Sequence, residues 1–145
     1  MAPISAQTRC YLPLDADAVT ELVDHGRLSG DLVAFVVTES VRRSDPSGDE
    51  EAWEFAALQD AAAFCQEHEQ PVLVAAADVS RDTIDASAAL GSRVVVRGPV
   101  PLPRVASVHV GDDLLGDVAV VSSADDVIEL SWYDATELAD VRSLL

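Results

Sequence analysis

The sequence predicts a single α+β domain with a mixed β-sheet of five to six strands and three to four helices. Its 145 residues are enough for one domain of ordinary size, and 49% of them are apolar, so a core can form. Strands and helices alternate only in the first half, because the connection after residue 96 is too short and too rich in proline for a helical crossover. A flavodoxin-like α/β fold is the alternative. We expect a flexible N-terminus at residues 1–8 and the domain at 9–145.

The first quarter of the chain has the pattern strand, helix, strand. Residues 9–14 form a short apolar run with a tyrosine and a proline near its end, which is typical of a strand. Asp15 or Asp17 can cap a helix that stops at Gly26. Residues 32–38 are almost uniformly apolar, as in a central strand that is covered on both faces.

The longest helix is expected at about residues 49–68, after a polar turn segment at 42–48. Ser47 stands three residues before Glu50, which is the spacing of a capping box. Several alanines along this helix leave little side-chain bulk, so we expect it to pack closely across the sheet.

Three further strands follow this helix. Residues 71–79 and 94–96 form buried strands, and the stretch between them has a weak helical turn. Residues 98–103 contain three prolines, which exclude regular structure there. Residues 105–110 alternate apolar with small or polar side chains and form another strand.

The C-terminal part begins with residues 117–122, whose pattern fits a helix or a strand equally well. Residues 127–133 alternate with a period of two, which predicts a strand. Asp134 or Thr136 then opens a terminal helix.

The charge of the chain limits its partners. Acidic residues number 26 against nine basic ones, which gives a net charge of −17. A molecule so acidic is repelled by phosphate, so we expect no nucleic acid as a partner through direct phosphate binding and no membrane. No apolar run approaches the roughly 18 residues that cross a bilayer. Cys10 and Cys65 lie in apolar stretches and are expected to be reduced and buried, so we expect a cytoplasmic protein.

Seven short blocks, spread over most of the chain, occur in a characteristic order. They are YLP at 11–13, AFVVT at 34–38, SGDEE at 47–51, VAAADV at 74–79, GPVPL at 98–102, ASVHV at 106–110 and WY at 132–133. In these blocks the chain resembles a small, uncharacterised family of actinobacterial proteins of unknown function. The resemblance implies an actinobacterial host, whose GC-rich genome accounts for the complete lack of lysine and asparagine better than adaptation to salt. It implies no activity.

Asp78 is the first candidate for catalysis, because it ends a buried strand, where open α/β sheets usually present their chemistry. With Glu39 or His109 it could form the site of a small hydrolase-like enzyme, and the structural alternative is a carboxylate that caps a turn. Ser107 and His109 point to the same face of their strand. A serine–histidine pair needs a third group and an oxyanion hole for nucleophilic catalysis, and the sequence has no pattern for either. A hydrogen-bonded sheet histidine is therefore favoured.

No pattern predicts a metal or a cofactor. The three histidines and two cysteines lack zinc-site spacing, and the glycines form no phosphate-binding loop. Trp132 and Tyr133 are candidate anchors for a protein partner. Arg42 and Arg43 could bind a small anion or an acidic peptide, although pairing with nearby carboxylates is commoner. The leading hypothesis is a protein-binding or regulatory module without catalytic activity, and the hydrolase-like enzyme is the alternative.

Overall fold

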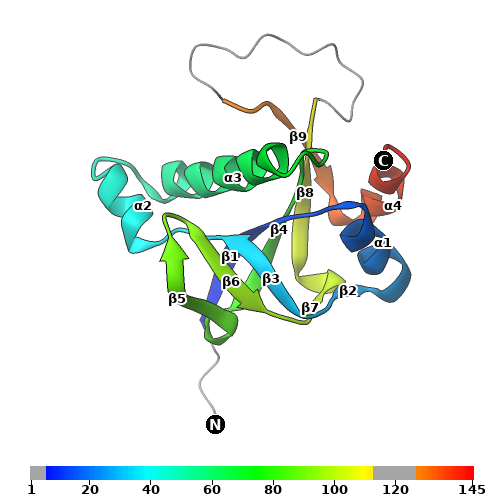
Figure 1. The fold of residues 1–145 in the computed structure, drawn as a ribbon, viewed down its shortest axis with the longest axis horizontal. Helices are drawn as coiled ribbons and strands as arrows, with labels where there is room; N and C mark the ends of the chain where they lie inside the picture. The colour runs from blue at the N-terminus through cyan, green and yellow to red at the C-terminus, as the bar shows by residue number, and fades with distance from the viewer. Residues whose placement is uncertain (1–5, 113–126) are drawn as a thin grey trace.

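The fold is built on one large antiparallel β-sheet with helices on both faces (Figure 1). The computed structural model describes residues 6–112 and 127–145. The strands in these residues are β1 (Gln7–Pro13), β2 (Arg27–Leu28), β3 (Asp31–Phe35), β4 (Leu73–Ser80), β5 (Ile84–Leu90), β6 (Arg93–Arg97), β7 (Val100–Pro101), β8 (Val105–Gly111) and β9 (Leu130–Asp134). The α-helices are α1 (Ala16–His25), α2 (Glu39–Ser44), α3 (Glu50–Glu67) and α4 (Leu138–Arg142). Three 3-10 turns complete them, at Arg81–Thr83, Leu102–Arg104 and Ala135–Glu137.

Seven of these strands form the main sheet, in the order β5-β6-β3-β1-β4-β8-β9. Every neighbouring pair is antiparallel. The short strands β2 and β7 pair separately. The predicted α+β class is confirmed, but the predicted mixed sheet of five to six strands is wrong, and so is the flavodoxin-like alternative. Helices α2 and α3 join β3 to β4, which lie on either side of β1, whereas β5–β6 and β8–β9 are neighbours in both the chain and the sheet.

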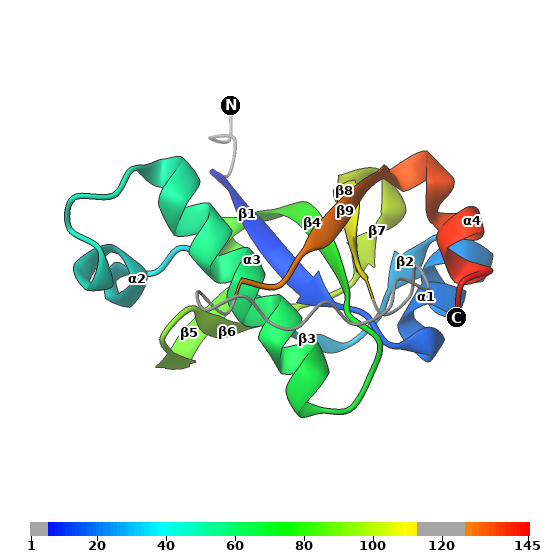
Figure 2. The same ribbon diagram turned by 90° about the horizontal axis from the view of Figure 1, so that it is seen from above.

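The two faces of the sheet bury different side chains because strand residues alternate between them. Toward α3 point residues such as Tyr11, Val74 and Ala76, which pack against the fully buried Ala57 and Ala61 of the helix. The opposite face carries the larger core, with α1, α4 and the β2–β7 pair packed on it. Figure 2 shows α1 and α4 side by side at one end of the molecule and α2 at the other.

Two predicted helices form where expected, and their caps explain why. The Asp15 side chain accepts a hydrogen bond from the Ala18 amide and begins α1. At α3 the cap is Asp49, which accepts from the amide of Ala52 at 2.9 Å. The predicted Ser47 capping box is therefore wrong, since a better acceptor stands two residues later.

Four elements were missed. The prediction that residues 98–103 form no regular structure is wrong, because β7 (Val100–Pro101) pairs with β2 and a 3-10 turn follows it at Leu102–Arg104. Thr38 caps the short helix α2 within the segment expected as a turn, and its hydroxyl also donates to the carbonyl of Gly91. The stretch expected to hold a helical turn keeps only a 3-10 turn at Arg81–Thr83 and then forms strand β5. The backbone hydrogen bonds of β5 are made with β6. Its small and polar residues do not by themselves predict a strand. Strand β2 is only two residues long and has no pattern of its own.

The remaining predicted strands occur with shifted ends. β1 begins at Gln7, two residues before the predicted start. β3 lies inside the sheet, beside the middle strand β1. β9 begins at Leu130, three residues after the predicted start, and Asp134 caps the 3-10 turn that leads into the predicted terminal helix, α4. Residues 117–122 lie outside the described residues.

Candidate functional site

The α3 face of the sheet carries three of the candidate residues, Asp78, Ser107 and His109. Arg9 on β1 is in register with Asp78 on β4, and His109 on β8 is in register with Trp132 on β9. Ser107 stands two residues before His109 and points to the same face. We call Arg9, Tyr11, Glu54, Asp78, Ser107 and His109 the polar cluster.

Asp78 is held by Arg9 through two hydrogen bonds. The Arg9 Nε donates to one carboxylate oxygen at 2.7 Å and the second guanidinium nitrogen to the other at 3.1 Å. The Arg9 guanidinium lowers the pKa of Asp78 below its usual range. A carboxylate with both oxygens bound to a cation is a weak base and a poor nucleophile, so its role here is to hold β1 against β4.

His109 and Ser107 contact each other, as their shared face predicts. The Ser107 Oγ lies 3.1 Å from the His109 Nε2. Burial lowers the pKa of His109, and the nearby charge of Arg9 adds to this, so the imidazole is neutral at neutral pH. Within the described residues no carboxylate bonds to the ring, and Ser107 is only 5% exposed. The pair therefore lacks the third group that would orient a catalytic histidine.

Tyr11 and Glu54 connect the cluster to α3. The Tyr11 hydroxyl donates to a Glu54 carboxylate oxygen at 3.3 Å. Burial and the charge of Glu54 raise the pKa of Tyr11, so the phenol stays protonated. Sequence reasoning missed Arg9, Tyr11 and Glu54, because their partners are assigned only by strand register and by the placement of α3.

The other candidates lie apart from the polar cluster. Glu39, Arg42 and Arg43 are all on α2, where Glu39 lies 3.9 Å from one guanidinium and 3.7 Å from the other. Arg97 likewise pairs with Asp85. Arg42, Arg43 and Arg97 therefore each pair with a carboxylate. The ion pairs of Glu39 join it to its own helix rather than to Asp78.

Trp132 and Tyr133 point to opposite faces of β9. Trp132 is 62% exposed, whereas Tyr133 packs against the larger core. The two were predicted as a joint anchor, but the alternation of a strand leaves only the tryptophan open to a partner. β9 is also the last strand of the sheet among the described residues.

Thiols and metal ligands add no reactive group in the described part of the chain. Cys10 and Cys65 form no disulfide and are fully buried. Burial raises the pKa of the Cys10 thiol to about 12, which suppresses its reactivity. No cluster of three or more potential metal-ligating side chains occurs in residues 6–112 and 127–145.

The fold and this site define an α+β protein in which the ion pairs of Arg9 with Asp78 and of Arg97 with Asp85 link neighbouring strands. The chain belongs to a family of unknown function, DUF6912, whose model matches residues 8–141. The predicted resemblance to an uncharacterised family is thereby confirmed. No curated protein and no solved structure matches the chain. Among the helices of the described residues, none has the length and apolar character needed to cross a membrane.

Proposed function

We propose that the protein is a non-enzymatic protein-binding module that receives an extended, basic segment of a partner protein along β9. The observation that carries this proposal is Trp132, a large aromatic side chain that is 62% exposed on the last strand of the sheet. An edge strand offers unpaired backbone groups to an added strand, and an exposed tryptophan is a typical anchor for its side chains.

The negative charge around β9 favours a basic partner segment. Residues 127–141 contain four carboxylates and no basic side chain. One of them, Asp134, accepts hydrogen bonds from the amide and hydroxyl of Thr136, which lower its pKa and keep it ionised. A segment with arginine or lysine beside small or β-branched residues complements this edge, and the net charge of −17 speeds its approach.

The two buried thiols, which form no disulfide, support a reducing compartment, and the sequence resemblance supports an actinobacterial host. We therefore place this module in the actinobacterial cytoplasm.

The test uses a synthetic peptide of about eight residues, the length of an ordinary strand, in which arginine alternates with threonine and valine. Binding is followed by nuclear magnetic resonance of the backbone amides. We expect saturable shifts and slower amide exchange in β9, because added-strand hydrogen bonds protect its outward amides.

Variants separate a specific edge from general attraction to an acidic protein. Trp132→Ala should weaken binding of the peptide about tenfold, the effect of removing an interface anchor. Phe55→Ala is the matched control, since it removes an aromatic side chain that is 49% exposed on α3 instead of β9. Equal binding by Trp132→Ala, or shifts spread over all acidic surfaces, would show that β9 is not the docking edge.

A small hydrolase is the second candidate function, favoured by the contact between Ser107 and His109. In that case Ser107 would be the nucleophile and His109 its base, with Asp78 outside the reaction because Arg9 holds it. Hydrolysis of p-nitrophenyl acetate by the protein and by Ser107→Ala decides the matter. Equal rates support the binding module, and a rate that depends on Ser107 supports the enzyme.

A further inference from the structure

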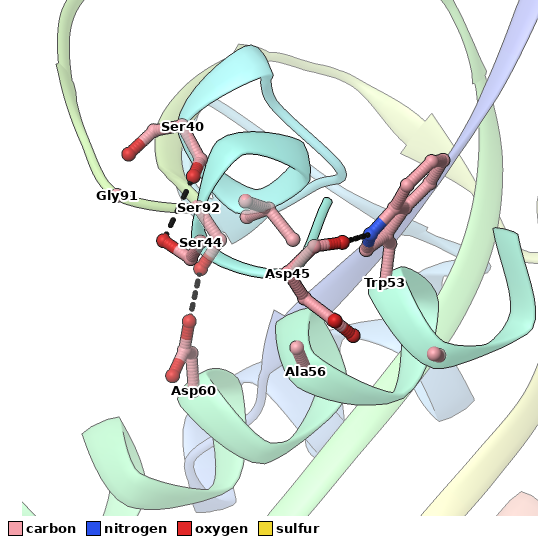
Figure 3. A pocket seen from close by; sticks show the side chains of 10 residues that line it. Ser40, Ser44, Asp45, Trp53, Ala56, Asp60, Gly91 and Ser92 are labelled. Carbon is pink, nitrogen blue, oxygen red and sulfur yellow. Dashed lines mark hydrogen bonds between the residues drawn. The ribbon is translucent and has the colours of Figure 1, made fainter. Parts of the chain in front are cut away.

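A cavity of about 300 Å³ lies between α2, α3 and the turn that joins β5 to β6 (Figure 3). This volume is at the lower limit for small-molecule sites, so only a small ligand fits. The lining consists of Ser40, Val41, Ser44, Asp45, Ala52, Trp53, Ala56, Asp60, Gly91 and Ser92. None of these residues belongs to the polar cluster or to β9.

One side of the cavity is apolar and rigid. Ala52 and Ala56 stand one helical turn apart on α3, so their methyl groups share one wall. The indole of Trp53 is fixed in place because its Nε1 donates to the carbonyl of Asp45 at 3.0 Å. The wall is therefore formed before any ligand enters.

The polar side of the cavity carries two carboxylates. Asp45 and Asp60 lie on either side of Ala56 in Figure 3. The hydroxyl of Ser92, which is 2% exposed, donates to Asp60 at 2.6 Å. Ser44 donates to the carbonyl of Ser40 and brings a second hydroxyl to the same space.

Neither of these carboxylates is neutralised. Among the described residues, no arginine lies within ion-pair distance of Asp45 or Asp60. Arg42 lies over the Trp53 ring at 5.6 Å from its centroid and pairs with Glu39. The cavity thus combines two carboxylates that form no ion pair with an indole over which one cation, Arg42, already lies.

We propose that this cavity binds a small organic cation of the primary amine class, with a short diamine as the best fit. An ammonium group has three donors and no acceptor, which matches carboxylate and hydroxyl oxygens. Two ammonium groups joined by a short methylene chain can meet Asp45 and Asp60 while the chain crosses the methyl group of Ala56. An anion would be repelled, and a neutral diol would leave both negative charges uncompensated.

The experiment is titration of the full chain with diaminobutane, followed by calorimetry and by the fluorescence of Trp53 in a Trp132→Phe background. We expect saturable binding with one site, and no response to butanediol, which has the same length without the charge. Asp60→Asn and Asp45→Asn should each weaken binding about tenfold, as expected for one lost charge-assisted contact.

Two further variants test whether a loss of diamine binding is specific to the cavity. Glu67→Gln removes one exposed negative charge from the far end of α3 and should leave the affinity unchanged. Gly48→Ala alters no charge, but an added Cβ would lie 2.8 Å from the Asp45 Cγ, so that carboxylate must move and binding should weaken. Unfolding midpoints identify any variant that fails to fold, and the proposal then depends on the others.

The proposal is overturned if diaminobutane binds with no saturation, if butanediol binds equally well, or if Glu67→Gln weakens binding as much as Asp60→Asn. The test is independent of the proposed docking on β9, because Trp132→Ala should bind the diamine normally.

Discussion

The ion pair between Arg9 and Asp78 decides whether this carboxylate serves structure or chemistry. We consider Arg9→Gln, Asp78→Asn and the double variant. The pair makes two hydrogen bonds, and its side chains are 36% and 38% exposed, so solvent screens part of the attraction. Exposed pairs contribute about 0.2–1 kcal/mol, and the two-bond geometry places this one near the upper end, at about 1 kcal/mol of coupling.

The assay is urea unfolding of the four proteins, from which the coupling energy follows as a double-mutant cycle. The sign of the pH dependence is fixed by the lowered pKa of Asp78. As the pH falls, the unfolded carboxyl takes up its proton before the folded one does, so the stabilisation is complete above the ordinary aspartate pKa and disappears in stronger acid. The pair of Arg142 and Asp24, with one bond and 40% and 50% exposure, is the control and should couple more weakly.

A coupling energy near zero at neutral pH would refute this reasoning. Asp78 would then be a carboxylate that Arg9 does not hold, and its role as a link between β1 and β4 would be wrong.

Three further predictions concern the fold around the site. Asp49→Ala should lower the free energy of unfolding by about 1 kcal/mol and Ser47→Ala hardly at all, because only Asp49 caps α3, and equal losses in urea unfolding would contradict the assigned cap. Iodoacetamide should modify Cys10 only after unfolding, since burial raises its thiol pKa to about 12, and mass spectrometry of the native protein would expose any faster reaction. The free energy of unfolding should fall as the pH drops through the ordinary histidine pKa of about 6.5, because the unfolded state then binds a proton that folded His109 resists. His109→Gln should remove that part of the pH dependence, and an unchanged profile would count against it.

The sequence predicts those elements whose signals are local. The helix α3 has a cap, an acidic first turn and an apolar face, and β4 is a continuous apolar run, so both lie close to their predicted positions. Strand β5 lacks such a signal, because the residues between Ile84 and Leu90 are all small or polar and its hydrogen bonds are made with β6. The antiparallel sheet was missed for a related reason, since strand direction depends on connections whose geometry is not local.

In the candidate site, too, only contacts between residues close in the sequence were predictable. The contact between Ser107 and His109 was predictable, because residues two apart on a strand share a face. The partner of Asp78 was not, because Arg9 stands far from it in the sequence and meets it only through the register of β1 with β4. The cavity beside Trp53 depends on α2, which the sequence reading took for a turn.

Both proposed ligands are cations, and this shared sign makes local variants more informative than salt. The net charge of −17 attracts any cation over a distance that salt reduces to about 8 Å at physiological ionic strength. Added salt should therefore weaken binding of the basic peptide and of the diamine alike, whether or not either ligand has a specific site. If each ligand has its own specific site, Trp132→Ala should weaken binding of the peptide only, and Asp60→Asn should weaken binding of the diamine only. If either substitution weakened both ligands equally, the attraction would belong to the charge of the whole molecule, and neither β9 nor the cavity would be a site.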